Sequence, residues 1–334
     1  MKRGWLPPGL MAVLIVALGA YTAARQPAFL SADNLNSLLL EAMPLALVSL
    51  GQASALLVGG FDVSVAALMT MCVVTASFTM TPTTTGLALV PGALALVGVG
   101  LATGAFNATL IWVFRMPSII ATLGALSILQ GASLVFRAYP AGPINSAVVG
   151  AMTAGAGFVP VAFIGTVVLA IAADLWLYRT RPGLALRAVG LDGTSSRRLG
   201  ISAGRAVFLA FIVCSLMASI GGFYLAAEVQ IGSPIIGNQA LESIAAAVLG
   251  GASLAGGKGS FIGTLLAALF LTEVDNVLPL FQQPTEYADM TIGVLILLAL
   301  VLYQAPELLA RSRAAWQAAR AKATWRAARP AGQD

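Results

Sequence analysis

Seven polar or aromatic side chains interrupt the apolar runs of this chain and could line a path for a polar solute. They are two carboxylates, three amides, a hydroxyl and an aromatic ring: Gln52, Phe61, Asp62, Ser64, Asn107, Gln130 and Glu242. Amides and carboxylates hydrogen-bond hydroxylated ligands, and an aromatic face can stack on a sugar ring. An ionised aspartate at the centre of a bilayer costs about 2.5–3.5 kcal/mol on insertion scales. We therefore take these seven residues as the candidate translocation pathway.

Each of these residues also has a structural interpretation. Asp62 follows a Gly-Gly pair, and at the first turn of a helix its carboxylate would meet free backbone N–H groups and a favourable dipole. The sequence does not decide whether Asp62 is a pathway residue or a helix cap. For Glu242 it favours a helix cap. Amide side chains within a membrane more commonly hydrogen-bond to neighbouring helices than to a ligand. A lone aromatic residue such as Phe61 more often packs against its neighbours than binds a ligand. Gly100-x-x-x-Gly104 is a pattern typical of close helix packing.

Several kinds of chemistry are excluded by the residues present. The chain has no histidine, and Cys72 and Cys214 lie in apolar runs far from any C-x-x-C spacing, so neither a metal site nor a disulfide is expected. Residues 256–260 resemble part of a phosphate-binding loop, but position 252 is Ala and Lys258 is followed by Gly. We predict a tight turn there, no cofactor on this chain, and no enzyme activity of its own.

The composition dictates what positions these residues. The chain is 59% hydrophobic and 9% charged, against about 25% charged residues in soluble domains. Apolar runs of about 20 residues match a bilayer core and must be helical there. We predict an all-α polytopic membrane protein with ten helices, at residues 10–24, 36–58, 61–80, 87–112, 117–136, 158–178, 206–227, 239–256, 259–277 and 288–304. Ten crossings divide five and five, which is compatible with an inverted repeat.

The basic residues set the orientation. If each predicted helix crosses once, 16 of the 18 Lys and Arg residues fall on one side, and only Arg25 and Arg137 fall on the other. Short cytoplasmic loops carry such an excess. We therefore expect both termini in the cytoplasm. Charges placed between apolar runs are a topology signal and not the basic face of a nucleic-acid-binding domain.

The domain organisation is simple. We expect a transmembrane domain over residues 1–306 and a basic cytoplasmic tail over 307–334. The stretch Leu10–Ala24 after Lys2 and Arg3 resembles a signal peptide, but no clear cleavage site follows, so an uncleaved first helix is favoured. Only Gly59 and Gly60 separate the second and third helices, which is compatible with a tight turn or with a break inside the membrane.

The longest polar connection, residues 179–206, carries six of the sixteen inner charges. It is longer than a connector needs to be. Thr194 or Ser195 is expected to cap a short helix that ends near Gly200, with Arg197 and Arg198 on its polar side. The apolar residues Leu199 and Ile201 would anchor it. These features favour a docking surface over a plain charged connector.

Four blocks along the chain, in order, resemble the permease subunits of bacterial ATP-binding cassette (ABC) importers for simple sugars, the ribose, xylose and autoinducer-2 group. They are Leu57-Val-Gly-Gly-Phe-Asp-Val-Ser-Val65, Pro117-Ser-Ile-Ile-Ala-Thr-Leu-Gly124, the polar connection followed by residues 245–260, and Gly293-Val-Leu-Ile-Leu-Leu-Ala-Leu300. The chain departs from the family pattern in two places. Phe61 replaces an aliphatic residue, and the stretch 190–196 replaces Gly-x-Asn-x-x-Ala-Ala.

The resemblance implies a function. Residues 191–201 would seat on a separate ATPase subunit, which binds the ATP and Mg²⁺. The ATPase-coupling residues would be Gly190, Asp192, Arg197, Arg198, Leu199, Gly200 and Ile201. The other partners would be an external sugar-binding protein, a second permease copy or a homologous permease, and membrane lipid. The alternatives are a self-sufficient secondary transporter, for which the charges within the spans are few, and a membrane enzyme, for which no catalytic constellation is present. The sequence does not identify the sugar.

Overall fold

A computed structural model describes residues 6–284, 287, 290–291, 293–294 and 297. The chain divides into two compact units, residues 1–289 and 290–334. The second unit has only five described residues, and all five are helical positions within the predicted helix 288–304. That helix as a whole and the tail 307–334 lie outside the described residues.

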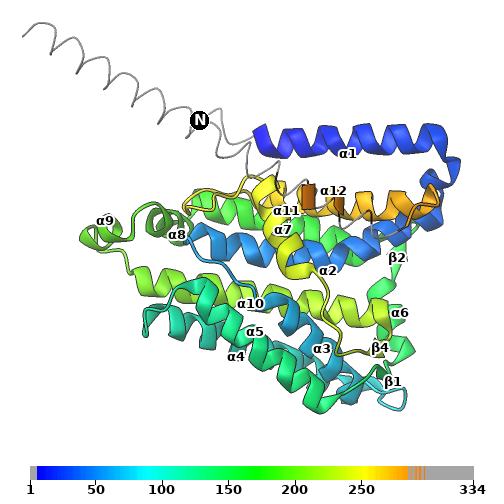
Figure 1. The fold of residues 1–334 in the computed structure, drawn as a ribbon, viewed down its shortest axis with the longest axis horizontal. Coiled ribbons are helices and arrows are strands. Elements are labelled where there is room, and N and C mark those ends of the chain that lie inside the picture. Colours follow the sequence, from blue (N-terminus) through cyan, green and yellow to red (C-terminus); the bar gives the residue numbers. More distant parts are fainter. Residues whose placement is uncertain (1–5, 285–286, 288–289, 292, 295–296, 298–334) are drawn as a thin grey trace, which may run out of the picture. The chain divides into compact units, whose positions relative to one another are not determined.

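The first unit is built of helices joined by short turns (Figure 1). The helices are α1 (Leu6–Arg25), α2 (Ala32–Leu57), α3 (Val65–Thr79), α4 (Val90–Trp112), α5 (Ser118–Phe136), α6 (Ser146–Thr153), α7 (Val161–Arg179), α8 (Arg181–Leu191), α9 (Gly193–Arg198), α10 (Ala203–Val229), α11 (Gln239–Leu249) and α12 (Phe261–Leu280). Single 3₁₀ turns, η1 (Pro27–Leu30) and η2 (Gly86–Leu89), precede α2 and α4.

Two small antiparallel ribbons complete the unit. β1 (Ala141–Pro143) pairs with β4 (Ile231–Gly232), and β2 (Gly155–Ala156) pairs with β3 (Val159–Pro160). Figure 1 places these ribbons at one end of the helices and α9 at the other. We call these the ribbon end and the α9 end.

Seven of the described helices are long and apolar enough to cross a bilayer: α1, α2, α4, α5, α7, α10 and α12. This confirms a mostly helical, multi-pass membrane protein. Two of the predicted spans, however, are wrong in extent. The helix expected over 61–80 is the 15-residue α3, and the one expected over 239–256 is the 11-residue α11. Both are shorter than the roughly 20 residues that a span needs.

Glycines mark the backbone turns at which these two helices fall short: α3 starts late after the turn at Gly59, and α11 ends early before Gly251. After α2, Gly59 has a φ of +75°, and after α11, Gly251 has a φ of +104°. These left-handed backbone conformations are open to glycine and stop a helix. Apolar composition alone therefore overestimated the helices, because it does not register where the backbone turns.

The core lies between α2 and α10, which are antiparallel: Gly51 packs against Cys214, and Gly221 packs against Pro44. The predicted close packing at Gly100 and Gly104 is confirmed. A Cβ on Gly100 would lie 2.7 Å from the Ser219 Cβ, and one on Gly104 would lie 2.9 Å from the Phe211 carbonyl oxygen. Small residues thus let α4 approach α10 closely.

The two halves of the unit use the same order of elements in opposite directions. α2 ends at the α9 end and is followed by the non-helical segment 58–64 and by α3, which runs to the ribbon end, where Ser77 lies against Gly232. α10 ends at the ribbon end and is followed by residues 230–238 and by α11, which returns to the α9 end, where Gly251 lies against Pro7. An inverted repeat has this order. The full five-and-five division stays a prediction, since it includes residues 288–304.

Candidate functional site

The segment 58–64 is a stretch of non-helical backbone inside a bundle of apolar helices. At membrane depth such backbone is tolerated only where protein groups satisfy its hydrogen bonds. Gly60 donates its N–H back to the Ala55 carbonyl at 3.0 Å, which closes the turn after α2. Gly60 also packs against the Phe211 ring of α10, where a Cβ would lie 2.8 Å from the Cζ atom.

Side chains of α5 pair with the next backbone groups. The Phe61 N–H donates to Ser118 Oγ at 3.1 Å, and the Val63 N–H donates to Thr122 Oγ1 at 3.2 Å. The Thr122 hydroxyl in turn lies 3.3 Å from the Phe61 carbonyl oxygen. Two of the blocks that carry the family resemblance, 57–65 and 117–124, therefore meet here, although more than 50 residues separate these partners in the sequence.

Asp62 is the centre of a fully buried polar cluster. With its amide oriented to satisfy both groups, Gln52 donates to the Asp62 carbonyl at 3.1 Å and accepts from the Asp62 N–H at 3.2 Å. The Asp62 carboxylate accepts from the Ser64 N–H at 2.9 Å, from the Ser64 hydroxyl at 2.5 Å and from Asn107 Nδ2 at 3.3 Å. The thiol of Cys214 lies beside it. Four predicted pathway residues are thus brought together.

This cluster is closed, because Gln52, Asp62, Ser64 and Asn107 are all 0% exposed. Within the described residues no Lys or Arg pairs with the Asp62 carboxylate, so hydrogen-bond donors replace a cation around it. The bonds reach Ser64, the N-cap residue of α3, and not the N–H groups of the first turn itself. The arrangement fixes the start of α3 relative to α2 and α4.

The other three pathway candidates lie apart from this core of four. The Phe61 side chain is half-buried beside the cluster, and only its backbone has a hydrogen bond. Gln130, on α5, donates to the Pro234 carbonyl at 3.1 Å and so ties α5 to the segment before α11. Glu242 is half-exposed in the first turn of α11, which is the position its helix-dipole interpretation requires.

The predicted docking segment forms two consecutive helices, α8 and α9. The short helix ends at Arg198, close to the expected Gly200, where φ is +79°. Its cap is not Thr194 or Ser195, however, but Asp192. The Asp192 carboxylate accepts from the N–H groups of Thr194 at 2.8 Å and Ser195 at 3.1 Å, because it precedes them at the N-cap position.

The same contacts lower the pKa of Asp192 below its usual 3.8, first through the Ser195 hydroxyl and then through the two backbone N–H groups. The surface around it is exposed and mixes apolar and basic groups. The side chain of Leu191 is 63% exposed and that of Leu199 is 79% exposed, and Arg197 and Arg198 lie between them. Exposed apolar side chains next to basic ones favour an interaction site.

The end of α8 packs against both breaks in the helices. The Leu57 carbonyl oxygen occupies the space that a Cβ on Gly190 would need, and the Gly257 nitrogen would lie 2.5 Å from that Cβ. The Gly257 N–H donates to the Leu57 carbonyl at 2.9 Å. A Cβ on Gly256 would lie 3.0 Å from the Gly59 nitrogen. The exposed helices therefore touch the turn before segment 58–64 and the turn after α11.

Sequence reasoning missed one residue at this junction, Asp174. It lies in α7, yet its carboxylate accepts from the N–H groups of Phe261 at 2.8 Å and Ile262 at 3.3 Å and from the Ser260 hydroxyl at 2.9 Å, so it caps α12. Nearby, the Tyr178 hydroxyl donates to the Gly259 carbonyl at 2.7 Å. An acidic residue inside a long apolar run was the available signal.

The turn predicted over 256–260 is confirmed between α11 and α12. Gly256 and Gly257 both have positive φ, and the Ser253 N–H donates to the Lys258 carbonyl at 2.9 Å. Among the described residues, no group of three or more His, Cys, Asp or Glu side chains could hold a metal ion. The two cysteines are free and buried, as expected of packing residues.

Comparisons with known proteins agree with the family resemblance that the four sequence blocks carry. The model of the family "Branched-chain amino acid transport system / permease component" matches residues 34–300. The autoinducer 2 import system permease protein LsrC of Enterobacter sp. (strain 638) is 33% identical over 86% of this chain and 84% of its own length. The ribose import permease protein RbsC of Escherichia coli (strain K12) is 30% identical over 90% and 94%. No solved structure matches the chain significantly.

Proposed function

The chain belongs to the family of branched-chain amino acid transport system permease components, and from this membership we propose that it is the membrane-spanning subunit of an ABC importer for a sugar or sugar-like solute. The relatives named above import ribose or autoinducer 2, which supports this class of solute and not the secondary-transporter alternative. In this proposal a separate ATPase supplies ATP and Mg²⁺, and an external binding protein delivers the solute.

One observation carries the mechanism: the segment of α8 and α9 that exposes Leu191 and Leu199 packs on Leu57 and Gly257 through Gly190. A push on the exposed surface would therefore reach both non-helical turns, the one that leads into α3 and the one that follows α11. We expect the ATPase to bind the residues from Leu191 to Ile201 and to move these two half-length helices. Transporters commonly form their solute site beside such interrupted helices, and one part of the bundle moves against another around that site.

The orientation follows from the charges. Arg179, Arg181, Arg187, Arg197, Arg198 and Arg205 lie in or beside α8 and α9, and an excess of Lys and Arg marks cytoplasmic loops. The α9 end would face the cytoplasm, where ATP is available, and the ribbon end would face the binding protein. The bacterial inner membrane is the location that fits such a system.

Reconstitution tests the proposal directly. Liposomes holding this chain would be loaded with the cognate ATPase and ATP, and uptake of radiolabelled ribose or autoinducer 2 would be measured with the binding protein outside. We expect uptake only when all three proteins are present. Uptake by this chain alone, driven by an ion gradient, would contradict the proposal and support the secondary transporter.

A further inference from the structure

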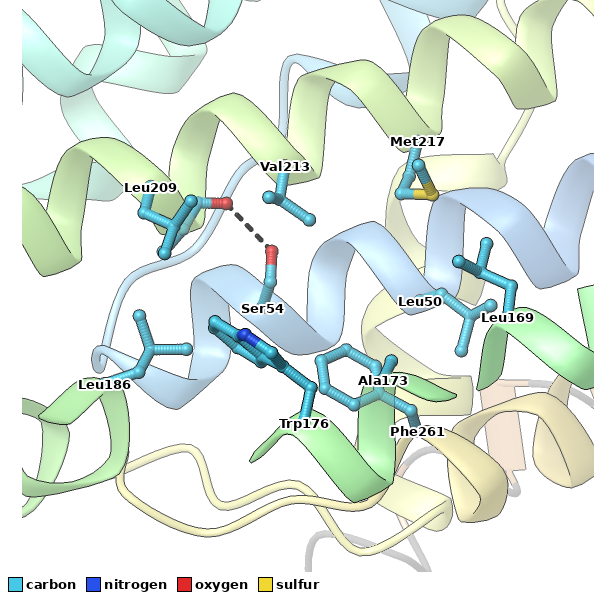
Figure 2. Close-up of a pocket in the computed structure, with 11 residues that line it drawn as sticks. Leu50, Ser54, Leu169, Ala173, Trp176, Leu186, Leu209, Val213, Met217 and Phe261 are labelled. Carbon is cyan, nitrogen blue, oxygen red and sulfur yellow. Dashed lines mark hydrogen bonds between the residues drawn. The ribbon is translucent and has the colours of Figure 1, made fainter. Parts of the chain in front are cut away.

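An apolar cavity of about 210 Å³ lies between the helices near the α9 end. Its walls come from α2, α7, α8, α10 and α12, and they expose no polar atom to it. The single hydroxyl in the wall, Ser54 Oγ, is already used, since it donates to the carbonyl oxygens of Gly51 and Ala210. Figure 2 shows Trp176 and Phe261 on one side of this cavity and Leu209, Val213 and Met217 of α10 on the other.

The cavity reaches the exposed surface of the helix bundle. Leu169 and Leu209, which line it, are each 39% exposed. α7, which supplies Leu169 and Trp176, also exposes Val168 and Leu175 by more than half. An apolar helix face of this kind in a membrane protein contacts acyl chains. An apolar cavity stays free of water unless polar groups line it, so the natural occupant from this side is hydrocarbon.

Positive charge lies next to the cavity at the membrane surface. Arg205 is one turn before Leu209 on α10, and Arg181 begins α8, which contributes Leu186 to the wall. Both arginines are exposed, and neither has an ion-pair partner among the described residues. Arg187 is different, because its guanidinium stacks on the Tyr178 ring at 4.4 Å and donates to the Gly257 carbonyl.

We propose that this cavity is a binding site for one acyl chain of an anionic phospholipid in the leaflet at the α9 end, with the headgroup held by Arg181 and Arg205. Apolar walls fit the chain, and basic residues at the membrane surface select an anionic headgroup. Leu186 of α8 and Phe261 of α12 both line the cavity. A bound lipid would therefore brace α8 against the bundle at the base of the exposed helices.

Trp176 gives a direct readout, because brominated acyl chains quench tryptophan fluorescence on contact. A variant that keeps Trp176 and replaces the other four tryptophans with phenylalanine would be reconstituted into vesicles of phosphatidylcholine. Brominated phosphatidylglycerol or brominated phosphatidylcholine would then be titrated in. We expect half-maximal quenching at a several-fold lower mole fraction of the anionic lipid, since each basic residue near the surface contributes about fivefold.

Two sets of variants separate the site from bulk lipid. Arg181→Gln with Arg205→Gln should bring the two lipids to equal quenching, and these surface changes leave the fold intact. Ala173→Leu, with Ala173→Phe as the stronger filler, should remove the selective component. A reporter at Ile164→Trp, on the exposed outer half of α7 with Trp176→Phe, should show no preference.

Three results would overturn the proposal: equal quenching of Trp176 by both lipids in the starting protein, selectivity that survives filling the cavity, or protection of Trp176 from both lipids by a second copy of the chain. The measurement needs neither ATPase nor sugar, so its outcome is independent of the transport function proposed above.

Discussion

Gly190, at the end of α8, lies directly against the carbonyl oxygen of Leu57, the last residue of α2. No other residue type fits at position 190 without moving one of these helices, because the oxygen already fills the space of a Cβ. This contact joins the exposed helices to the turn that leads into the buried Asp62 cluster. It connects the proposed docking surface to the interior of the bundle.

Gly190→Ala should therefore uncouple the two regions or destabilise the chain. We expect a lower thermal unfolding midpoint, or, where the chain adjusts, loss of substrate-stimulated ATPase activity in the reconstituted complex. Gly193→Ala is the matched control, since nothing lies within 4 Å of the added Cβ. Wild-type stability and full stimulation in Gly190→Ala would show that the contact carries no signal.

Reversing both charges of α9, in Arg197→Glu with Arg198→Glu, should abolish transport without loss of membrane insertion. Both arginines are exposed, and in the sequence they stand between exposed Leu191 and Leu199 of the proposed ATPase surface. The control is Arg311→Glu with Arg313→Glu, which changes the net charge equally within the tail. If substrate-stimulated ATPase activity survives the α9 reversal, the docking assignment is wrong.

Asp62→Asn separates the two interpretations of this residue. An amide keeps the shape of the carboxylate but faces the donors of Ser64 and Asn107 with an NH₂ group, and loss of hydrogen bonds to a charged group costs about 1.5–3 kcal/mol. We expect a clearly lower thermal midpoint, with Asp33→Asn on the exposed start of α2 as the control. An unchanged midpoint together with an altered KM for the sugar would identify a pathway residue instead.

Thr122→Val tests whether side chains hold the segment 58–64. The substitution keeps the shape and removes the hydroxyl that pairs with Phe61 and Val63. Leaving the part-buried Val63 N–H without a partner should cost about 1–3 kcal/mol of folding free energy. Thr109→Val is the comparison, because that hydroxyl bonds only the Ala105 carbonyl of its own helix. Equal unfolding midpoints for the two variants would refute this role.

The lowered pKa of Asp192 predicts how binding of the ATPase depends on pH. Its pKa is lowered in the folded chain, so its carboxylate stabilises α9 above the ordinary value of 3.8 and this contribution is lost only as the pH falls through the lowered folded pKa. ATPase binding should therefore not change between pH 6 and pH 8 on account of this group. Asp192→Asn, a good N-cap, should retain binding in a pull-down assay, and Asp192→Ala should weaken it. Equal binding by both variants would contradict the role of the cap.

The sequence by itself determined the class of the protein. Apolar runs of bilayer length predicted a polytopic helical membrane protein. The structure confirms this for seven helices, and the family match agrees with it. The order of the four blocks predicted the permease family. The class and the family depend on short segments or on sums over the chain. Composition, run length and motif order are therefore enough to predict them.

Only the tertiary structure decided where the spans break and which polar residues meet. The true lengths of α3 and α11 depend on backbone turns at Gly59 and Gly251 that apolar composition does not register. The grouping of Gln52, Asp62 and Asn107 depends on how α2, α4 and segment 58–64 pack. Asp174 caps α12 from 86 residues away, and the Leu57 contact selects glycine at 190. Such pairings are set by how the helices pack together, and the spacing of residues along one helix does not determine that packing.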